Sequence, residues 1–241
     1  LNWNNVIRVL QFAVIHRALF TLSMALRQAI TDATEFQIKL AELQTISQKI
    51  GFTTEQWARQ VRVLSDAFGN PIFDTTEGIY QALSNQVVKT AQDFGFLNSA
   101  MKLSLITTAS FKDAVDASSS ILNAFNMTTA ESARVNAILF KTVGLGRVRL
   151  GEMSNTIGRV SVLSEKLNVS FQQQQALLAT LTNQGVKFNV AQTLLVNIFN
   201  KLIRPSERLE GIFAQWGVTS GEAAIKTFGL VDVFRRLEHI A

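Results

Sequence analysis

The sequence predicts an all-α protein, an array of about a dozen short to medium helices joined in hairpins and corners, with no sheet. Its 241 residues include only 2 Pro and 13 Gly, the residue types that most disfavour a helix interior. Apolar residues recur at intervals of three and four, as they do from Leu150 to Leu167. A junction typical of helix ends also recurs along the chain. We expect residues 1–50 to form an N-terminal amphipathic helical segment and residues 51–241 a helical core domain.

The recurring junction consists of Gly or Asn, then an apolar residue, then Ser or Thr. Gly or Asn can adopt the left-handed conformation just beyond a helix end. The hydroxyl group then caps the next helix, and a Glu or Gln three residues later completes a capping box. The pattern predicts four helix starts, at Gly51, Thr53 and Gln56; at Asn126, Thr128 and Glu131; at Asn168, Ser170 and Gln173; and at Gly217, Thr219 and Glu222.

Other helix breaks are predicted where Gly, Pro or short polar residues cluster. They are Gly69 to Pro71, the vicinity of Gly95, Ala109 with Ser110, Gly144 to Gly146, Gly185, and Arg204 to Ser206. No segment sustains three heptads of apolar a and d residues with charged flanks, so the sequence predicts no long coiled coil. Short links favour a compact array over separate domains.

The composition favours a protein whose surface is partly covered by neighbours. Hydrophobic residues make up 47% of the chain and charged residues 17%, against roughly 25% charged residues in an average soluble domain. The net charge of +5 favours anionic partners, which include DNA, acidic protein surfaces and anionic lipid. Because the basic residues are spread along the chain, ordinary solvated charges explain them more simply than a nucleic-acid patch does. The absence of Cys excludes disulfides.

The most apolar stretch runs from Val6 to Ile30. Arg8, His16, Arg17 and Arg27 interrupt it, so no run reaches the roughly 18 uncharged residues that a membrane span needs. We expect an amphipathic helix or one buried in a bundle. A helix with Arg and no acidic residue could also lie on or enter a bilayer.

The sequence predicts no enzyme, no catalytic residue, no cofactor and no metal site. Nucleophilic catalysis needs a base beside the nucleophile, and the two His residues, His16 and His239, lie at opposite ends of the chain. Two His and no Cys are too few for an imidazole or thiolate metal site. Asp113 and Asp116 lie one helical turn apart, but no apolar pocket is evident around them, so a solvated helix face explains them.

The segment from Gly144 to Gly151 contains several glycines, as phosphate-binding loops do. It lacks the Gly-Lys-Ser or Gly-Lys-Thr of a P-loop, and a helix rather than a strand precedes it, so we interpret it as a flexible connection between helices. Arg147 and Arg149 within it are candidate contacts for an anionic partner.

Several features follow one another in a specific order between Ser118 and Val218. They are Asn126-Met127-Thr128, a helix from Glu131 to Val143, the glycine-containing link, Glu152-Met153-Ser154 through Gly158, Leu167 to Ser170, Ala176 to Gly185, Ala191 to Leu195, Leu202 to Ser206, and Trp216 to Val218. This series resembles the conserved core of the TP901-type phage tail tape measure proteins. Two residues depart from that pattern, since Asn168 replaces the usual Gly and Gln192 stands where a small residue is common.

The resemblance implies a non-enzymatic structural protein. Because the sequence starts at Leu1 without a Met and stops at Ala241 just after a helical pattern, we expect it to be a piece of a longer chain. Such a protein occupies the lumen or tip of the virion tail, sets tail length and leaves ahead of the DNA to assist genome delivery through the host envelope. Its partners would be tail tube and tail tip proteins and further copies of itself, as a trimer or hexamer, with contacts to the host membrane or DNA. Two alternatives stay open: a membrane-active amphipathic helical protein and a generic helical adaptor module.

Overall fold

The computed structural model describes the backbone of residues 3–154 and 156–240, and the side chains of those ranges from residue 16 onward. These residues form thirteen α-helices and two short 3₁₀ turns, without a strand, so the predicted all-α class is confirmed. The helices are α1 Trp3–Ile46, α2 Thr54–Phe68, α3 Ile72–Ser84, α4 Phe94–Thr107, α5 Phe111–Ala124, α6 Ser132–Gly146, α7 Leu150–Ser154, α8 Ile157–Lys166, α9 Phe171–Asn183, α10 Phe188–Ile203, α11 Glu207–Gln215, α12 Gly221–Phe228 and α13 Leu230–Glu238; the turns are η1 Ala91–Asp93 and η2 Thr129–Glu131.

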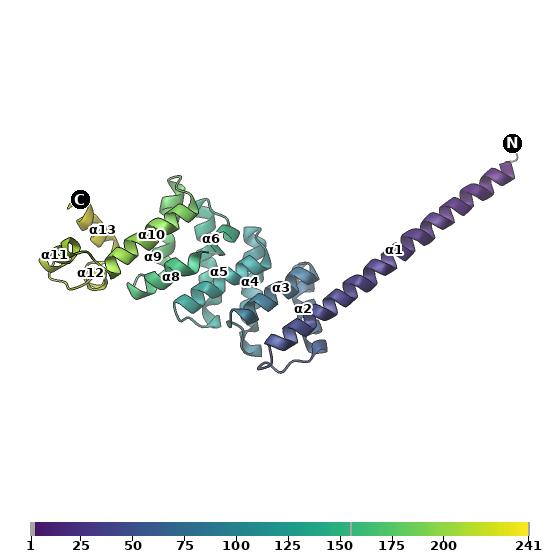
Figure 1. Ribbon diagram of the computed structural model, residues 1–241, viewed down its shortest axis with the longest axis horizontal. Helices are drawn as coiled ribbons and strands as arrows, with labels where there is room; N and C mark the ends of the chain where they lie inside the picture. The colour runs from purple at the N-terminus through teal and green to yellow at the C-terminus, as the bar shows by residue number, and fades with distance from the viewer. Residues whose placement is uncertain (1–2, 155, 241) are drawn as a thin grey trace.

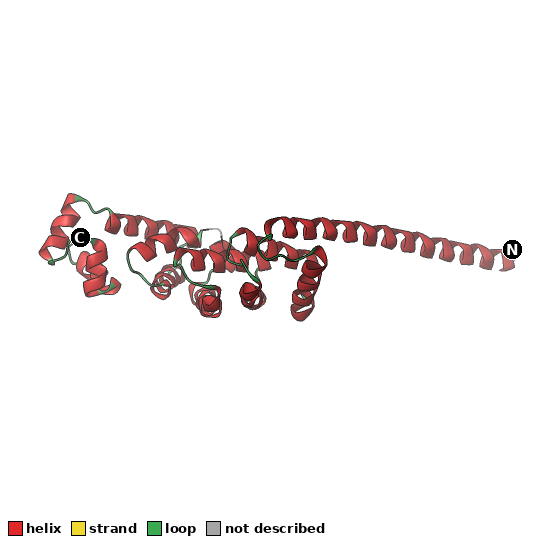
Figure 2. Cartoon of the chain, turned by 90° about the horizontal axis from the view of Figure 1, so that it is seen from below, coloured by secondary structure: helices red, strands yellow, loops and turns green. Residues whose placement is uncertain are grey.

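The helices from the end of α1 to α10 stack in two layers (Figures 1 and 2). In the first layer α3 packs on α1, α5 on α3, α7 and α8 on α5, and α10 on α8. In the second layer α4 contacts α2, α6 packs on α4, and α9 packs on α6. The chain therefore crosses from one layer to the other at almost every corner, and each helical hairpin packs on the hairpins beside it, as in helical repeat proteins.

The corners that return the chain from the second layer to the first are regularly spaced. Gly69, Thr108, Arg147 and Gly185 each have a positive φ at these corners, and they follow one another at intervals of about 39 residues. The sequence shows the corner motif but not this longer period. The reason is that the four equivalent positions hold three different residue types, two of which rarely adopt a positive φ.

One continuous hydrophobic core runs through the array from Phe36 to Val233. Close approaches between helix backbones set its spacing. A Cβ atom on Gly78 of α3 would lie 2.1 Å from the Phe111 ring of α5, and one on Gly146 of α6 would lie 3.1 Å from the Ala179 backbone of α9. The largest fully buried side chains include Trp57, Phe96, Phe111, Phe171, Phe199 and Phe213.

Helix α1 differs from the predicted short to medium helices because it continues for 44 residues. Only its last turns join the core, where Phe36, Leu40 and Leu43 are buried. Every side chain from His16 to Thr31 is exposed, so this stretch is not buried in a bundle, and the helix projects from the array as a rod (Figure 1). Among the described residues no helix is both long enough and apolar enough to cross a membrane.

Candidate functional site

The predicted corners are built as their residue types require. The Gly or Asn that follows each preceding helix is left-handed, with φ of 73° at Gly51, 51° at Asn126, 57° at Asn168 and 75° at Gly217. After Asn168 the Val169 N–H donates to the Ser164 carbonyl oxygen (2.8 Å), which satisfies a carbonyl left free at the end of α8. Asn168 thus adopts the conformation that Gly has at this position in the family pattern.

Two of the predicted corners form complete capping boxes at the start of an α-helix, and Thr128 with Glu131 forms one at the start of a 3₁₀ turn. The Thr53 hydroxyl accepts from the Gln56 N–H (3.3 Å), and the Thr53 N–H donates to Gln56 Oε1 (2.8 Å). Ser170 and Gln173 repeat the arrangement with distances of 3.3 and 3.0 Å. Each box satisfies backbone donors that the first turn of a helix leaves free.

The corner at Asn126 begins with the 3₁₀ turn η2 instead of an α-helical turn. The Thr128 N–H donates to Glu131 Oε2 (3.1 Å), and the backbone N–H of Glu131 donates to the Thr128 carbonyl oxygen (3.0 Å). Helix α6 then starts at Ser132, four residues after Thr128.

The predicted cap at Thr219 is wrong. Helix α12 begins at Gly221, and the Ser220 hydroxyl accepts from the Ala223 N–H (3.1 Å), so Glu222 lies in the first turn and closes no box with Thr219. The reason is a tertiary contact: a Cβ on Gly221 would lie 2.4 Å from the Leu202 carbonyl oxygen. The close approach of α12 to α10 moves the helix start by one residue.

The link that contains Arg147 and Arg149 is shorter than predicted. Helix α6 continues through Gly144 to Gly146 and α7 starts at Leu150, so only three residues connect them. Arg147 is left-handed with φ of 54°, both Arg side chains are exposed, and Val148 between them is buried. The link is a tight corner instead of a flexible loop.

This corner lies beside the next return corner because α6 packs on α9. The two corners border an open cleft of about 750 Å³, lined by Arg147, Glu152 and Lys187 among others. Arg149 does not line it. One carboxylate thus faces two cationic side chains, which leaves a modest excess of positive charge at this edge.

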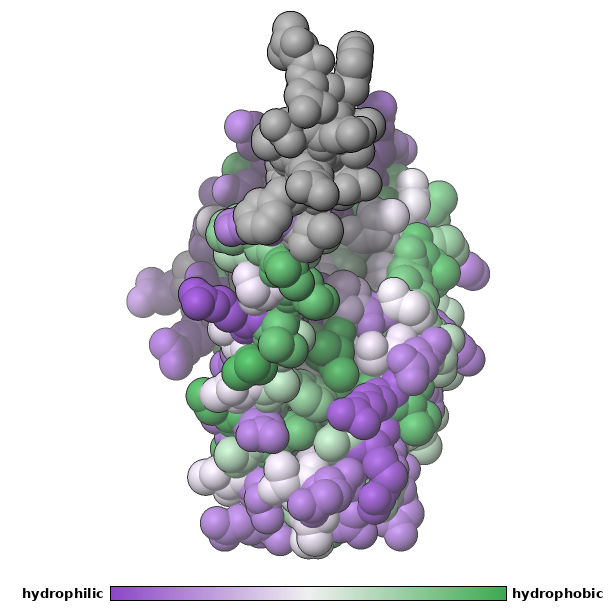
Figure 3. Space-filling view, turned by 90° about the vertical axis from the view of Figure 1, so that its right-hand side faces the viewer, coloured by the Kyte–Doolittle hydropathy of each residue, from purple (hydrophilic) through white to green (hydrophobic). Residues whose placement is uncertain are grey.

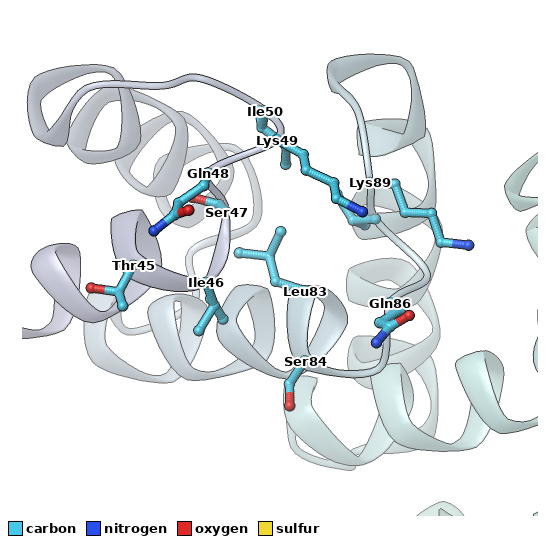
Figure 4. A pocket seen from close by; sticks show the side chains of 11 residues that line it. Thr45, Ile46, Ser47, Gln48, Lys49, Ile50, Leu83, Ser84, Gln86 and Lys89 are labelled. Carbon is cyan, nitrogen blue, oxygen red and sulfur yellow. The ribbon is translucent and has the colours of Figure 1, made fainter.

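A second cleft, of about 560 Å³, lies where α1 and α3 end (Figure 4). Lys49 and Lys89 lie on its rim, and Figure 4 shows Lys49 extending toward the segment that holds Lys89. Cationic side chains beside the C-terminal ends of helices are stabilised by the free carbonyl groups there. Lys49 and Lys89 follow the last residues of α1 and α3 by three and five positions, so these helix ends favour a cation in the cleft without a bound anion.

The paired carboxylates of α5 hold neighbouring elements together. Asp113 accepts hydrogen bonds from the hydroxyl groups of Ser110 (2.8 Å) and Ser154 (3.1 Å), and Asp116 accepts from the Asn85 amide (2.8 Å). Both carboxylates thus have partners that explain them structurally. Among the described residues no group of three His, Cys, Asp or Glu side chains could hold a metal ion.

Asp93 links the corner before α4 to the corner before α6. Its carboxylate accepts from the Thr129 hydroxyl (2.8 Å) and from the backbone N–H groups of Lys89 (3.0 Å) and Thr90 (2.9 Å). Burial raises the pKa of Asp93, but these hydrogen bonds outweigh burial and hold the pKa below its ordinary value. The sequence analysis missed this residue, although Thr90 and Asp93 have the spacing of a capping box. Its contact with Thr129, 36 positions away, is visible only in the structure.

Gln192, the second departure from the family pattern, is buried in α10, and its amide nitrogen has no hydrogen-bond partner.

Comparison with known proteins places the molecule in a family. Residues 58–240, which include most of α2 and all of α3 to α13, match the family described as phage-related minor tail proteins. The chain belongs to this family. A curated protein, the "Probable tape measure protein" of Clostridium phage phiCD119, is 28% identical over 156 residues, which are 63% of this chain and 16% of that protein. No solved structure matches.

These matches confirm the resemblance to phage tail tape measure proteins that the residue pattern indicates. The chain spans about one sixth of the length of the curated relative. The minor tail family match covers most of the two-layer array and leaves all of α1 outside it.

Proposed function

We propose that this minor tail protein is a segment of a tape measure protein, which occupies the tail tube, sets tail length and leaves ahead of the DNA during genome delivery. The observation that most supports the proposal is the similarity to a protein named as a probable tape measure protein, since it extends over 63% of the chain. The structure is compatible with a packing role, because its charged and polar clusters act in helix caps and corner contacts.

Within this function the chain is non-enzymatic and works through its surfaces. Its partners are tail tube and tail tip proteins and further copies of itself as a trimer or hexamer. Arg147 and Arg149 are exposed at one corner and are the candidate contacts for an anionic partner, including DNA. The location is the virion tail, and after ejection the host cell envelope.

In-frame deletions in the full-length chain of the phage test the proposal. An α-helix rises about 1.5 Å per residue, so deleting about 100 residues from the long helical part of the chain shortens the tail by roughly 150 Å. Electron microscopy of purified particles measures the change. Tails of unchanged length after such deletions contradict the tape measure role.

A membrane-active role is the second candidate. It is favoured by the exposed apolar side chains of α1, among them Leu19, Phe20 and Met24. Flotation of the chain with anionic vesicles tests it, with Phe20→Ser and Met24→Ser as the variant. Binding that the variant loses supports this role, and equal or absent binding removes it.

A further inference from the structure

Two neighbouring helices of the second layer expose large apolar side chains on their outer surface. On α4 these are Leu105 (48% exposed) and Ile106 (57%), and on α6 they are Phe140 (45%) and Leu145 (68%). They are separate from the exposed apolar side chains of α1, which lie at the end of the molecule that Figure 3 shows. Because α6 packs on α4, the four side chains lie on adjoining helices.

Each of these helices presents the same pair of residue types at the same places. Helices α4 and α6 both run to a return corner, and the two corners, at Thr108 and Arg147, are 39 residues apart. Lys102 and Ile106 of α4 have counterparts at the same interval, which are Lys141 and Leu145 of α6. All four of these side chains are exposed. Since equivalent positions of stacked hairpins lie side by side, a lysine and a large aliphatic side chain repeat from one helix to the next.

Carboxylates are missing from this part of the layer. The sequence has no Asp or Glu in α4, α6 or α9. On the α2 side Asp66 holds the position equivalent to Leu105, so the acid-free surface ends there. The first layer differs, since the Lys112 ammonium of α5 pairs with the Glu77 carboxylate of α3 (2.9 Å). Among the described residues no carboxylate forms an ion pair with the lysines of α4 and α6.

We propose that this surface binds an acidic amphipathic helix of another tail protein. Exposed apolar side chains beside cations that have no carboxylate of their own are complementary to a partner with carboxylates beside its apolar side chains. The inference rests on the proposed function, because it takes the partner from the virion tail. The surface, which we term the α4/α6 face, consists of Lys102, Leu105, Ile106, Phe140, Lys141 and Leu145.

A helix fits the spacing of the α4/α6 face. Packed helices lie roughly 8–10 Å apart, so Ile106 and Leu145 are separated by about that distance. Two residues seven positions apart on an α-helix lie on one side of it and are separated by about 10.5 Å along its axis. A partner helix that crosses α4 and α6 therefore places two apolar residues, i and i+7, on Ile106 and Leu145. Carboxylates beside that stripe, also seven positions apart, then reach Lys102 and Lys141.

Anionic lipid and DNA fit the α4/α6 face less well. A lipid surface is typically recognised by clusters of about four to eight Lys or Arg, and this face has two. DNA interfaces are polar and strongly positive, so phosphate groups would leave the exposed aliphatic side chains without apolar partners. An acidic helix satisfies the lysines and the aliphatic side chains together.

Photo-cross-linking in assembled phage tests the partner. The full-length chain carries benzoylphenylalanine in place of Leu145, and mass spectrometry of purified tails identifies what it links to. We expect a segment of another tail protein with more Asp and Glu than Lys and Arg, and with apolar residues seven positions apart. The control carries the same group in place of Val162, which is 45% exposed on α8 of the first layer, and does not link to that segment.

Charge reversal tests the two lysines. A synthetic peptide of the linked segment is titrated into the 241-residue chain and into the double variant Lys102→Glu with Lys141→Glu. We expect the variant to bind at least about ten times more weakly, and the difference to shrink at high salt because salt screens the charges. The matched control, Arg159→Glu with Lys166→Glu on α8, reverses the same charge and keeps its affinity within about two-fold.

A reciprocal exchange separates lost contacts from lost folding. A peptide whose carboxylates are replaced by Lys should restore binding to the Lys102→Glu, Lys141→Glu variant, which an unfolded chain could not do. Circular dichroism shows whether each variant keeps its helices. Equal loss of binding in the α8 control, or no recovery with the exchanged peptide in a folded variant, overturns the proposal.

The identity of the cross-linked molecule decides the remaining alternatives. A link from position 145 to a second copy of this chain, to DNA or lipid, or to a segment without an excess of acidic residues overturns the proposal. The proposed function fails on a different result. Normal control of tail length without a link to an acidic tail protein refutes the α4/α6 face alone. The expected link in a phage whose deletions leave tail length unchanged refutes the tape measure role alone.

Discussion

The array and the projecting part of α1 are both helical, but different contacts support them. In the array each helix lies between neighbours, and even a single Cβ at Gly78 would collide with the next helix. From His16 to Thr31 the backbone of α1 is just as regular, yet no other segment in the described part of the chain covers it. The comparison teaches that helix formation alone shows little about stability, since most helix stability in proteins comes from tertiary packing.

The largest expected difference between the two regions follows removal of an aromatic side chain. Trp57 is fully buried, donates to the Ser47 hydroxyl (2.8 Å) and packs 5.3 Å from the Phe52 ring centroid. Trp57→Ala should lower the free energy of unfolding by about 3–5 kcal/mol, measured in urea. Phe20→Ala, at a side chain that is 63% exposed, should change it by less than about 0.5 kcal/mol. Equal effects would contradict the comparison.

Glycine substitutions sharpen the same contrast within the array. Gly78→Ala places a methyl group 2.1 Å from the Phe111 ring, and such overpacking should cost about 1–3 kcal/mol of stability. Gly144 is a helical glycine of α6 with no atom within 4 Å of a built Cβ. Gly144→Ala should therefore raise stability by up to about 1 kcal/mol. Thermal unfolding of both variants checks the opposite signs.

Removing the N-terminal cap of α12 should have a smaller effect on the free energy of unfolding. Ser220→Ala removes the hydroxyl that accepts from Ala223 and should cost about 1 kcal/mol. Thr219→Ala should leave stability within about 0.5 kcal/mol of the original, because Thr219 is exposed and caps no helix. Denaturant unfolding of the two variants decides between the caps, and a larger loss from Thr219→Ala would restore the original prediction.

The smallest expected effect concerns pH. Because hydrogen bonds hold the pKa of Asp93 below its ordinary value, its contribution to stability is present above the unfolded value of about 3.9 and is lost as pH falls through the lower folded pKa. Asp93→Asn should weaken the pH dependence of stability between about pH 5 and pH 3. If the variant loses as much stability at acidic pH as the original protein does, Asp93 contributes nothing to that loss.

The sequence predicted those parts of the fold that local chemistry determines. Left-handed Asn168 and the boxes at Thr53 and Ser170 involve atoms a few residues apart, so a short motif describes them fully. The predicted cap at Thr219 was wrong because a contact between α10 and α12, which are distant in sequence, determines where α12 begins. Arg147 could not be identified as a left-handed corner, since Arg seldom adopts a positive φ.

The sequence predicted less of the candidate surfaces than of the fold. The exposure of Arg147 and Arg149 could be expected from a polar link, but the approach of Lys187 depends on which corners the two layers bring together. The apolar stripe of α1 is visible in the sequence as a spacing. Only the structure shows that it is buried from Phe36 to Leu43 and that its positions from Leu19 to Ala33 are exposed.

Native-state hydrogen exchange tests the difference between the two regions most directly. Because no other described segment covers residues 16–31, we expect weak amide protection there and strong protection in the core of the array, for example in α5. Equal protection of residues 16–31 and of α5 would contradict the account.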